Sequence, residues 1–343
     1  MAFYDSLFNA FGLREWCDAS AGSAKMTMAS LLAKTNPDAA DEGPLLPFPS
    51  MDELYKACPS FPQSREFTAG VEEAFLNAKD VLKTVLDPLT QPLSWLLEGA
   101  LFIFLAAPWW IVVPLILLFV WYVCRSVAVT TFVTVSFVFL AFIDHLDAAL
   151  QTLAIIAVCT GICIILGVPI GIAMAKSNRL QRSLLPLLDL LQTLPTFVYL
   201  IPLIFLFSVT EPKLYGIAII VYAIVPVIRL TDLGIRLVDQ DVVEAANAFG
   251  MSSRQKLLGI ELPLALPNIM AGVNQTIMMS LAMVVIASLV SAPGLGVLVL
   301  RGIRNLELGV GLIAGLGIVL LAVILDRVSK AAIARVSTDQ TFK

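Results

Sequence analysis

The chain has 343 residues, of which 59% are hydrophobic and 14% are charged, and its formal net charge is −4. Soluble domains carry roughly 25% charged residues, so this composition excludes an ordinary soluble protein and predicts a chain that lies mostly in lipid. The sequence has no basic patch interleaved with aromatic residues, and nucleic-acid binding is therefore not indicated.

Residues 1–65 have a mixed composition and are predicted to form a polar N-terminal tail. Apolar residues recur at helical spacing within residues 1–13, which indicates a short amphipathic helix. The stretch 36–62 is rich in Pro and acidic residues, as is typical of a linker. The beginning of the chain lacks the basic start and the continuous apolar core of a cleaved signal peptide.

Residues 66–107 show helical periodicity and are predicted to form an amphipathic, interfacial region. The segment 93–105 is apolar enough to lie in the membrane interface, whereas Glu98 argues against a full span. An ordinary soluble amphipathic helix is the alternative for this region.

Seven apolar runs follow, each near the ~20 residues that a bilayer requires. We therefore predict an all-α polytopic membrane protein with about seven transmembrane helices. The first two spans, within 108–143, are accessory helices that only Arg125 separates. The predicted spans are 108–124, 126–143, 149–175, 184–208, 214–231, 265–291 and 308–326.

The distribution of basic residues predicts the orientation, because cytoplasmic loops carry an excess of Lys and Arg. Three segments that alternate consistently along the chain hold such residues and are assigned to the cytoplasm. Arg301 and Arg304 then lie on the outer side, against this rule, and the N-terminal tail lies outside provided that 93–105 does not cross. The cytoplasmic residues are Lys176, Arg179 and Arg182; Arg236, Arg254 and Lys256; and Arg327, Lys330 and Arg335.

The predicted fourth and sixth spans contain an unusual number of prolines and polar residues. Polar side chains at this depth normally face a bundle interior or a cavity, so we expect these spans to line a translocation path. The alternative for each residue is a hydrogen bond that joins two helices. The candidate path residues are Asp189, Gln192, Thr193, Phe197, Tyr199, Asn274, Gln275, Thr276, Ser280 and Ser288.

Asp189 is a special case, because an unpaired charge inside a span costs roughly 2.5–3.5 kcal/mol on insertion scales. A structural ion pair with Arg229 or Lys176 is the favoured role. Attraction of a cationic substrate group is the alternative.

Residues 244–263 form a polar island between the fifth and sixth spans and are expected to fold as a helix–turn–helix on the membrane surface. Asp241 is predicted to cap the first helix, with Glu244 in its first turn. Gly250 suits a left-handed helix stop, and Ser252 or Ser253 can begin the second helix. Pro263 is expected to end that helix.

Few residues suggest catalysis or metal binding. The five cysteines form no Cys-x-x-Cys pair; Cys124, Cys159 and Cys163 lie in apolar runs and are expected to be small apolar fillers. The one histidine, His145, is expected to be an interfacial polar residue, and no dense metal-ligand cluster accompanies it. We therefore expect no enzymatic activity, metal or cofactor in this chain.

The polar island has the form Glu-Ala-Ala, three residues, Gly, nine residues and Ile-x-Leu-Pro. It resembles the cytoplasmic loop by which permease subunits of bacterial ABC importers dock onto a separate ATPase. Further segments between 145 and 330 resemble the glycine betaine/proline-type branch, whose systems take up methylated amines. These segments are 191–202, 226–230, 262–276, 283–288, 294–296, 299–302 and 324–327.

The resemblance implies a five-helix permease core within 144–330, followed by a cytoplasmic tail, 331–343. It implies a permease homodimer, two cytoplasmic ATPase subunits that bind ATP and Mg, and a periplasmic substrate-binding protein, all at the bacterial inner membrane. No Gly-x4-Gly-Lys-Ser/Thr loop is found in this sequence, in agreement with ATP binding by another chain. The expected docking residues are Asp241, Glu244, Ala245, Ala246, Gly250, Ser253, Leu262 and Pro263.

The expected cargo is glycine betaine, proline betaine, choline, carnitine or trimethylamine N-oxide, among which the sequence does not choose. An importer for another small polar solute is the first alternative. A secondary transporter is favoured by the polar, proline-broken spans but opposed by the docking loop. A non-transport scaffold would leave the polar spans unexplained.

Overall fold

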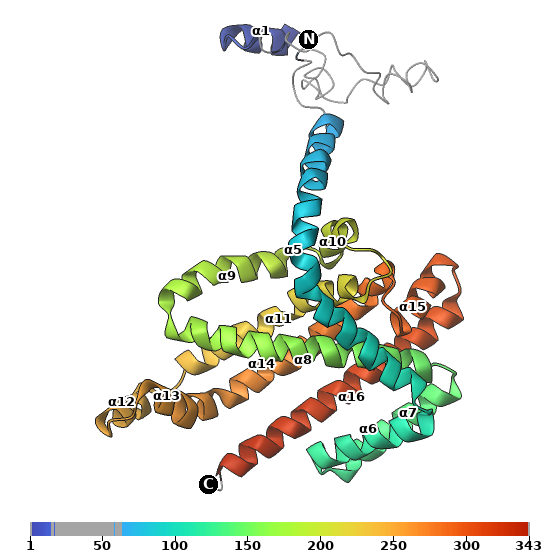
Figure 1. Ribbon diagram of the computed structural model, residues 1–343, viewed down its shortest axis with the longest axis vertical. Coiled ribbons are helices and arrows are strands. Elements are labelled where there is room, and N and C mark those ends of the chain that lie inside the picture. The colour runs from blue at the N-terminus through green and yellow to red at the C-terminus, as the bar shows by residue number, and fades with distance from the viewer. Residues whose placement is uncertain (1, 15–16, 18–57, 59–63, 342–343) are drawn as a thin grey trace. The chain divides into compact units, whose positions relative to one another are not determined.

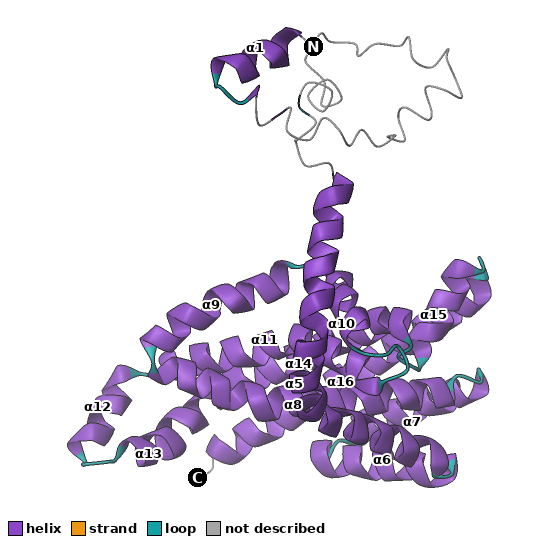
Figure 2. Cartoon of the chain, turned by 45° about the horizontal axis from the view of Figure 1, so that its top comes forward, coloured by secondary structure: helices purple, strands orange, loops and turns teal. Residues whose placement is uncertain are grey.

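The computed structural model describes residues 2–14, 17, 58 and 64–341 and divides into two units, Met1–Asp80 and Val81–Lys343. Helices and connecting loops make up the described part, which contains no strand (Figures 1 and 2). The predicted all-α class is confirmed. The finer boundaries predicted at 66, 108, 144 and 331 remain predictions.

The first unit contains helix α1 (Ala2–Ala10), which lies within the predicted amphipathic segment. Phe8 of α1 is buried in a small cluster with Cys17 and Cys58, and these two cysteines form a disulfide. The pairing was not predicted, because nothing in a weakly patterned tail relates two cysteines 41 residues apart. Apart from Cys58, the predicted linker 36–62 lies outside the described residues.

Helix α5 (Ser64–Ala106) covers the predicted interfacial region as one continuous helix. In the second unit its residues pack on the start of a core helix, where Asp87 binds Lys213 at 2.7 Å. By length and composition, Thr68–Ala106 also qualifies as a candidate membrane span, despite Glu98. The expectation that 93–105 lies in the interface therefore remains a prediction.

Helices α6 (Trp109–Cys124) and α7 (Val127–Phe142) match the first two predicted spans in position but not in length. Each has 16 residues and is thus about 24 Å long, less than the hydrocarbon core of about 30 Å. Within the described residues, five helices are long and apolar enough to cross a membrane, or six if one bent pair counts as a span. Four of the seven predicted spans correspond to such long helices, the predicted fourth span corresponds to the bent pair, and the first two correspond to the short helices α6 and α7. The remaining long helix, Thr68–Ala106, was not among the seven.

Helices α8 (Leu146–Lys176), α11 (Pro212–Arg236) and α14 (Leu262–Ala287) form the centre of the second unit. They lie side by side in Figure 1 and pack closely, with glycines where the backbones approach. Helices α15 (Leu295–Arg304) and α16 (Leu308–Thr341) form an adjoining hairpin. Helix α16 continues into the predicted C-terminal tail.

The predicted fourth span, 184–208, is broken, as its prolines indicated, and is not one continuous helix. The segment forms α9 (Asn178–Thr193), the short 3₁₀ helix η2 (Thr196–Tyr199) and α10 (Leu200–Leu206), with a bend of 107°. The break occurs at Leu194 and Pro195, because proline lacks an N–H and disfavours helical geometry in the residue before it. Leu194 is accordingly extended.

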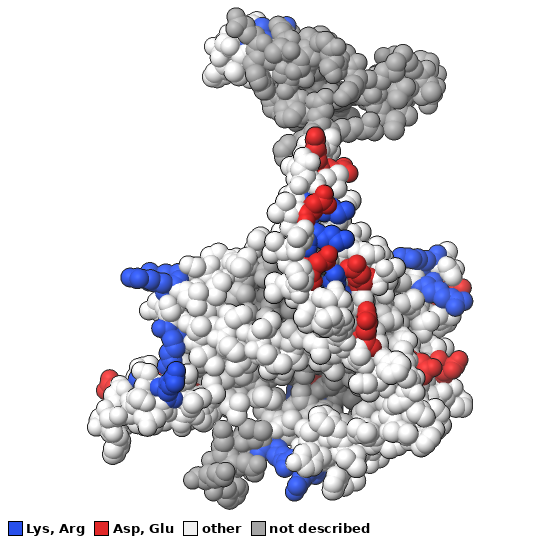
Figure 3. All heavy atoms as spheres, viewed as in Figure 1, with Lys and Arg blue, Asp and Glu red and all other residues white. Residues whose placement is uncertain are grey.

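The basic residues that were assigned to the cytoplasm lie toward one end of this bundle. In Figure 3, Lys and Arg side chains gather where α9 begins and beside the loop between α11 and α14; others lie near α15 on the opposite side. Arg236 bonds Asn178, which joins two of the predicted cytoplasmic segments directly. We call this end of the bundle the loop end.

Candidate functional site: the elbow at the loop end

Residues 239–261 connect α11 to α14 and are here called the elbow. Its first helix, α12 (Gln240–Ala248), begins one residue after Asp239, whose carboxylate accepts a hydrogen bond from Asp241 N at 3.0 Å. The cap is therefore Asp239 and not Asp241, which lies in the first turn of the helix. Both carboxylates still lie at the positive end of the helix dipole.

The end of α12 follows the prediction for Gly250. This residue has φ +73°, and its N–H bonds the carbonyl oxygen of Asn247 at 3.0 Å. The next N–H, that of Met251, bonds the carbonyl oxygen of Ala246 at 3.1 Å. These two bonds define a Schellman turn, which requires a left-handed residue and thus favours glycine.

The second part of the elbow begins at Ser252, which forms a capping box with Gln255 ahead of α13 (Ser253–Lys256). The chain continues without a break through a π-helical turn, η3 (Leu257–Glu261), into α14. Pro263 lies in the first turn of α14, directly after the π-helical turn, so it does not end a helix as expected. Movement of the elbow can therefore pass directly into α14.

The predicted docking residues divide into an exposed and a packed group. Ala246 is only 3% exposed and faces the chain's own core, whereas Phe249 is 88% exposed. Phe249 was missed by the sequence analysis, although an aromatic residue next to a helix-stopping glycine in a polar loop is a usable signal. The exposed predicted residues are Asp241, Glu244, Ala245, Gly250 and Ser253; Leu262 and Pro263 are partly buried.

Apolar contacts hold the inner side of the elbow on the core. Val243 and Leu257 pack on a cluster that includes Ile235 and Ala265. Ala175, near the end of α8, joins the same cluster. The elbow is thus packed on both α8 and α11 and does not hang free from the bundle.

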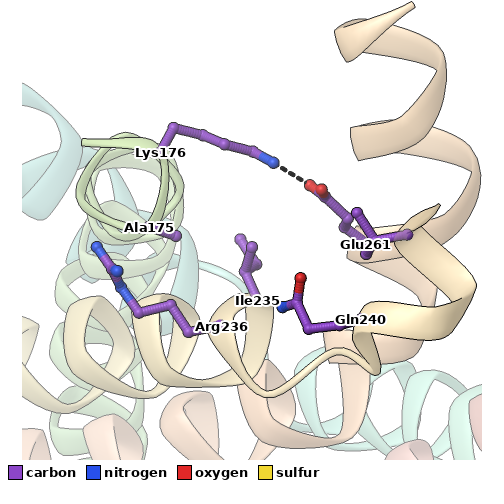
Figure 4. Close-up of a pocket in the computed structure, with 7 residues that line it drawn as sticks. Ala175, Lys176, Ile235, Arg236, Gln240 and Glu261 are labelled. Carbon is purple, nitrogen blue, oxygen red and sulfur yellow. Dashed lines mark hydrogen bonds and ion pairs between the residues drawn. The ribbon is translucent and has the colours of Figure 1, made fainter. Parts of the chain in front are cut away.

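A pocket of about 300 Å³ lies beside this apolar contact (Figure 4). An ion pair between Lys176, the last residue of α8, and Glu261, the last residue of η3, extends across it. The side chain of Glu261 is 6% exposed and that of Lys176 is 41% exposed. The lining residues are Ala175, Lys176, Ile235, Arg236, Gln240, Val243 and Glu261.

Arg236 also lines the pocket, and each of its three guanidinium nitrogens donates a hydrogen bond to α8, α9 or α11. It donates to Asp232 at 2.8 Å, to Asn178 at 2.7 Å and to the carbonyl oxygen of Met174 at 2.7 Å. Asp232 also accepts a bond from Gln181 at 2.7 Å. This network fixes α8, α9 and α11 to one another at the loop end. The sequence analysis used Arg236 only for orientation.

Several of the predicted path residues bond to other helices of the chain. Asn274 donates to Asp326 at 3.3 Å and accepts from Ser329 at 2.6 Å, which joins α14 to α16. Ser280 accepts from Thr160 of α8 at 3.2 Å. For these residues the structure displays the helix-joining arrangement that was the alternative.

Other path residues show different environments. Asp189 forms an ion pair with Arg229, which is the favoured structural pairing. Tyr199 is buried and lies 6.3 Å from the ring of Tyr222. Thr276 is buried, and its hydroxyl has no hydrogen-bond partner among the described residues. The role of these residues in a path remains a prediction.

The remaining members of the predicted set differ in bonding and exposure. The hydroxyls of Thr193 and Ser288 bond carbonyl oxygens in their own helical segments, at 3.1 and 3.2 Å. Phe197 and Gln275 are exposed, and Gln192 is half-buried. None of these contacts joins two members of the predicted set, so their place in a path also remains a prediction.

The chain is similar in sequence to known membrane subunits of transport systems. Residues 167–338 match the family model "Binding-protein-dependent transport system inner membrane component". The chain is 37% identical over 321 residues to the glycine betaine/proline betaine transport system permease protein ProW of Escherichia coli (strain K12), over 92% of this chain and 88% of that protein. It is 42% identical over 229 residues to the glycine betaine transport system permease protein OpuAB of Bacillus subtilis (strain 168), over 66% and 76% of the two chains.

Two further matches are partial. The trimethylamine N-oxide transport system permease protein TmoV of Ruegeria pomeroyi is 41% identical over 196 residues, which cover 57% of this chain and 30% of that protein. A solved inward-facing structure of the MetNI methionine ABC transporter superposes with a TM-score of 0.51 at 18% identity, over 56% of this chain and 95% of that one. At this identity the superposition shows a common fold only.

Proposed function

The chain belongs to the family of binding-protein-dependent transport system inner membrane components, and from that premise we propose that it imports a small methylated amine. It is a permease subunit of an ABC importer in the inner membrane. The proposed cargo is glycine betaine, proline betaine, choline, carnitine or trimethylamine N-oxide.

One observation carries the choice of cargo class. The similarity to a glycine betaine/proline betaine permease extends over 92% of this chain, including the broken fourth span and the elbow. The names of other relatives specify glycine betaine with carnitine, and trimethylamine N-oxide. These solutes share a small cationic or strongly dipolar methylated nitrogen, which supports the class and leaves its individual members open.

The proposed assembly contains two copies of this chain, two cytoplasmic ATPase subunits and a periplasmic binding protein. The exposed face of the elbow, with Glu244, Ala245, Phe249 and Gly250, is the proposed ATPase contact. ATP and Mg bind to the ATPase in this assembly. The binding protein makes the main selection of cargo through an aromatic cage that holds the methylated nitrogen by cation–π contacts.

The elbow gives this assembly a physical means of coupling. ATP binding closes the ATPase pair and displaces the two elbows, and each elbow continues through η3 into α14. The permease then switches from inward-facing to outward-facing, because ATP binding favours one of two conformations. This chain transmits the movement through the elbow and α14, and the ATPase hydrolyses the ATP.

An uptake assay tests the proposal. Proteoliposomes that contain the permease, its ATPase and the binding protein are expected to accumulate radiolabelled glycine betaine only when ATP is present with the ATPase. Unlabelled proline betaine, choline, carnitine and trimethylamine N-oxide, added as competitors, should rank the members of the class. Transport of an unrelated polar solute with no competition by any methylated amine would refute the cargo class.

Phe249 allows a separate test of the ATPase contact. Buried aromatic anchors commonly carry about 2 kcal/mol or more of binding energy, so Phe249→Ser is expected to weaken ATPase binding about thirtyfold or more. Because Phe249 is 88% exposed in this chain, the melting temperature of the permease should not change. Leu306→Ser is the control, since Leu306 is 89% exposed and lies outside the elbow. Equal ATPase recovery with both variants would contradict the assignment.

A further inference from the structure

Two different kinds of contact attach the elbow to α8. The first is the apolar packing of Val243 and Leu257, which lies on the inner side of the elbow. The second is the ion pair between Lys176 and Glu261. The pocket of about 300 Å³ borders this ion pair, so close packing does not join α8 to η3 on that side (Figure 4).

The position of the ion pair suits the transmission of movement. Lys176 ends α8, and Glu261 is the last residue of the elbow, at the end of its π-helical turn and directly before α14. Single π-helical turns occur frequently at functional sites and interrupt the regular hydrogen bonding of a helix. A displacement of η3 can therefore reach α8 through this pair, whereas the pocket beside it would absorb a displacement of packed side chains.

Arg236, the other cation that lines the pocket, does not connect the core to the elbow. Arg236 is held by Asp232, Asn178 and the carbonyl oxygen of Met174, none of which belongs to the elbow. Lys176 instead extends from the core to the elbow. Of the two cations that line the pocket, Lys176 is thus the one that bridges the moving and the fixed parts.

We propose that the Lys176–Glu261 ion pair is a clasp that makes α8 follow the elbow during each ATP cycle, so that both residues act as positioning residues in coupling. The inference rests on the proposed function, in which the elbow receives its movement from the ATPase. The competing explanation is that Lys176 only neutralises a carboxylate that would otherwise be buried without a partner, which would be costly.

The double substitution Lys176→Ala/Glu261→Ala separates these explanations, because it removes the bridge without leaving a charge unpaired. In proteoliposomes with ATPase and binding protein, the number of solute molecules carried per ATP is expected to fall about fivefold or more. The melting temperature should stay closer to that of the native chain than in Lys176→Ala, which leaves Glu261 unpaired. The single variant Lys176→Arg should retain coupling, since it keeps the bridging positive charge.

Lys330→Ala is the matched control. Lys330 pairs with Asp326 at 2.8 Å within α16, and the variant therefore breaks an ion pair that does not bridge the elbow. Its solute-to-ATP ratio should remain unchanged. A native ratio in the double alanine variant would overturn the clasp and leave Lys176 with charge neutralisation only.

A reducible covalent crosslink in place of the ion pair allows coupling to be measured with and without the connection in one sample. The variant Lys176→Cys/Glu261→Cys, joined by a short reducible crosslinker, is expected to couple ATP hydrolysis to uptake; reduction should remove that coupling. The native chain, treated in the same way, controls for its own cysteines. Equal coupling before and after reduction would contradict the clasp even if the double alanine variant did not fold.

Hydrogen–deuterium exchange distinguishes failure of the clasp from failure of the cargo assignment. With the ATPase bound, adding ATP should change exchange in residues 171–176 of the native chain and not in the double alanine variant. This measurement requires no cargo, so it is valid even if no methylated amine is transported. The same change in both chains would overturn the proposal.

Discussion

Gly250→Pro is expected to abolish ATP-driven uptake while the permease still inserts into the membrane. Gly250 has φ +73°, whereas proline fixes φ near −65° and has no N–H to bond the carbonyl oxygen of Asn247. The turn that sets α13 against α12 is therefore lost, at a local cost of about 3 kcal/mol. The measurements are uptake in proteoliposomes, recovery of the ATPase with the permease, and the amount of permease in the membrane.

Two milder substitutions of Gly250 test whether its left-handed backbone conformation, and not a steric clash, is what uptake requires. A Cβ at Gly250 would meet no atom within 4 Å, so Gly250→Ala tests backbone conformation without a clash. Its left-handed conformation costs an alanine roughly 1–2 kcal/mol, and we expect partial uptake. Gly250→Asn should come closer to the native value, because asparagine tolerates this conformation. Native uptake by Gly250→Pro would contradict the assignment of the elbow.

Glu244→Arg tests the exposed face of the elbow without changing the backbone conformation of the turn at Gly250. Glu244 lies on the exposed side of α12, so a reversed charge alters the surface offered to the ATPase and not the packing behind it. ATPase binding and uptake are expected to be lost together, with Glu244→Gln intermediate.

Gly171→Val is expected to prevent the core from packing, with loss of monodisperse permease in detergent. A Cβ at Gly171 of α8 would lie 2.6 Å from Thr231 Cβ and 2.7 Å from the carbonyl oxygen of Ile228. The backbone oxygen belongs to α11 and cannot move as a flexible side chain would. Overpacking of this kind typically costs about 1–3 kcal/mol or more. The measurement is the melting temperature and the elution profile after solubilisation.

Gly161→Val is the matched control, since it places the same β-branched residue in the same helix. A Cβ at Gly161 would meet no atom within 4 Å, so this variant should elute and melt like the native chain. The difference between the two variants isolates the contact with α11 from the helix propensity of valine. Equal loss of stability in both would mean that the close approach of α8 and α11 is not required.

Features that depend on a few neighbouring residues could be predicted from the sequence. The stop at Gly250 and the start of α13 at Ser252 depend on hydrogen bonds across three to five residues, and the sequence displays both partners. Even so, the first cap was assigned to Asp241, although Asp239 accepts the bond. The positions of the apolar helices could be predicted because transfer into lipid depends on composition summed along a segment.

The direction of each side chain was decided by the tertiary structure. The sequence places Asn274, Ser280 and Asp189 within predicted spans but does not show which helix each side chain faces. Their bonds reach Asp326, Thr160 and Arg229, which are far away in the sequence. The Lys176–Glu261 ion pair and the Cys17–Cys58 disulfide likewise join residues that are far apart in the sequence.

The sequence alone thus determined the helical class, the elbow and the membership of a transport family, because local hydrogen bonding, hydropathy and motif spacing are properties of contiguous residues. Only the tertiary structure decided the 107° bend, the shortness of α6 and α7, and the choice of Arg229 as the partner of Asp189. Those features depend on how helices pack against one another, and packing free energy is shared between segments that a one-dimensional pattern does not relate.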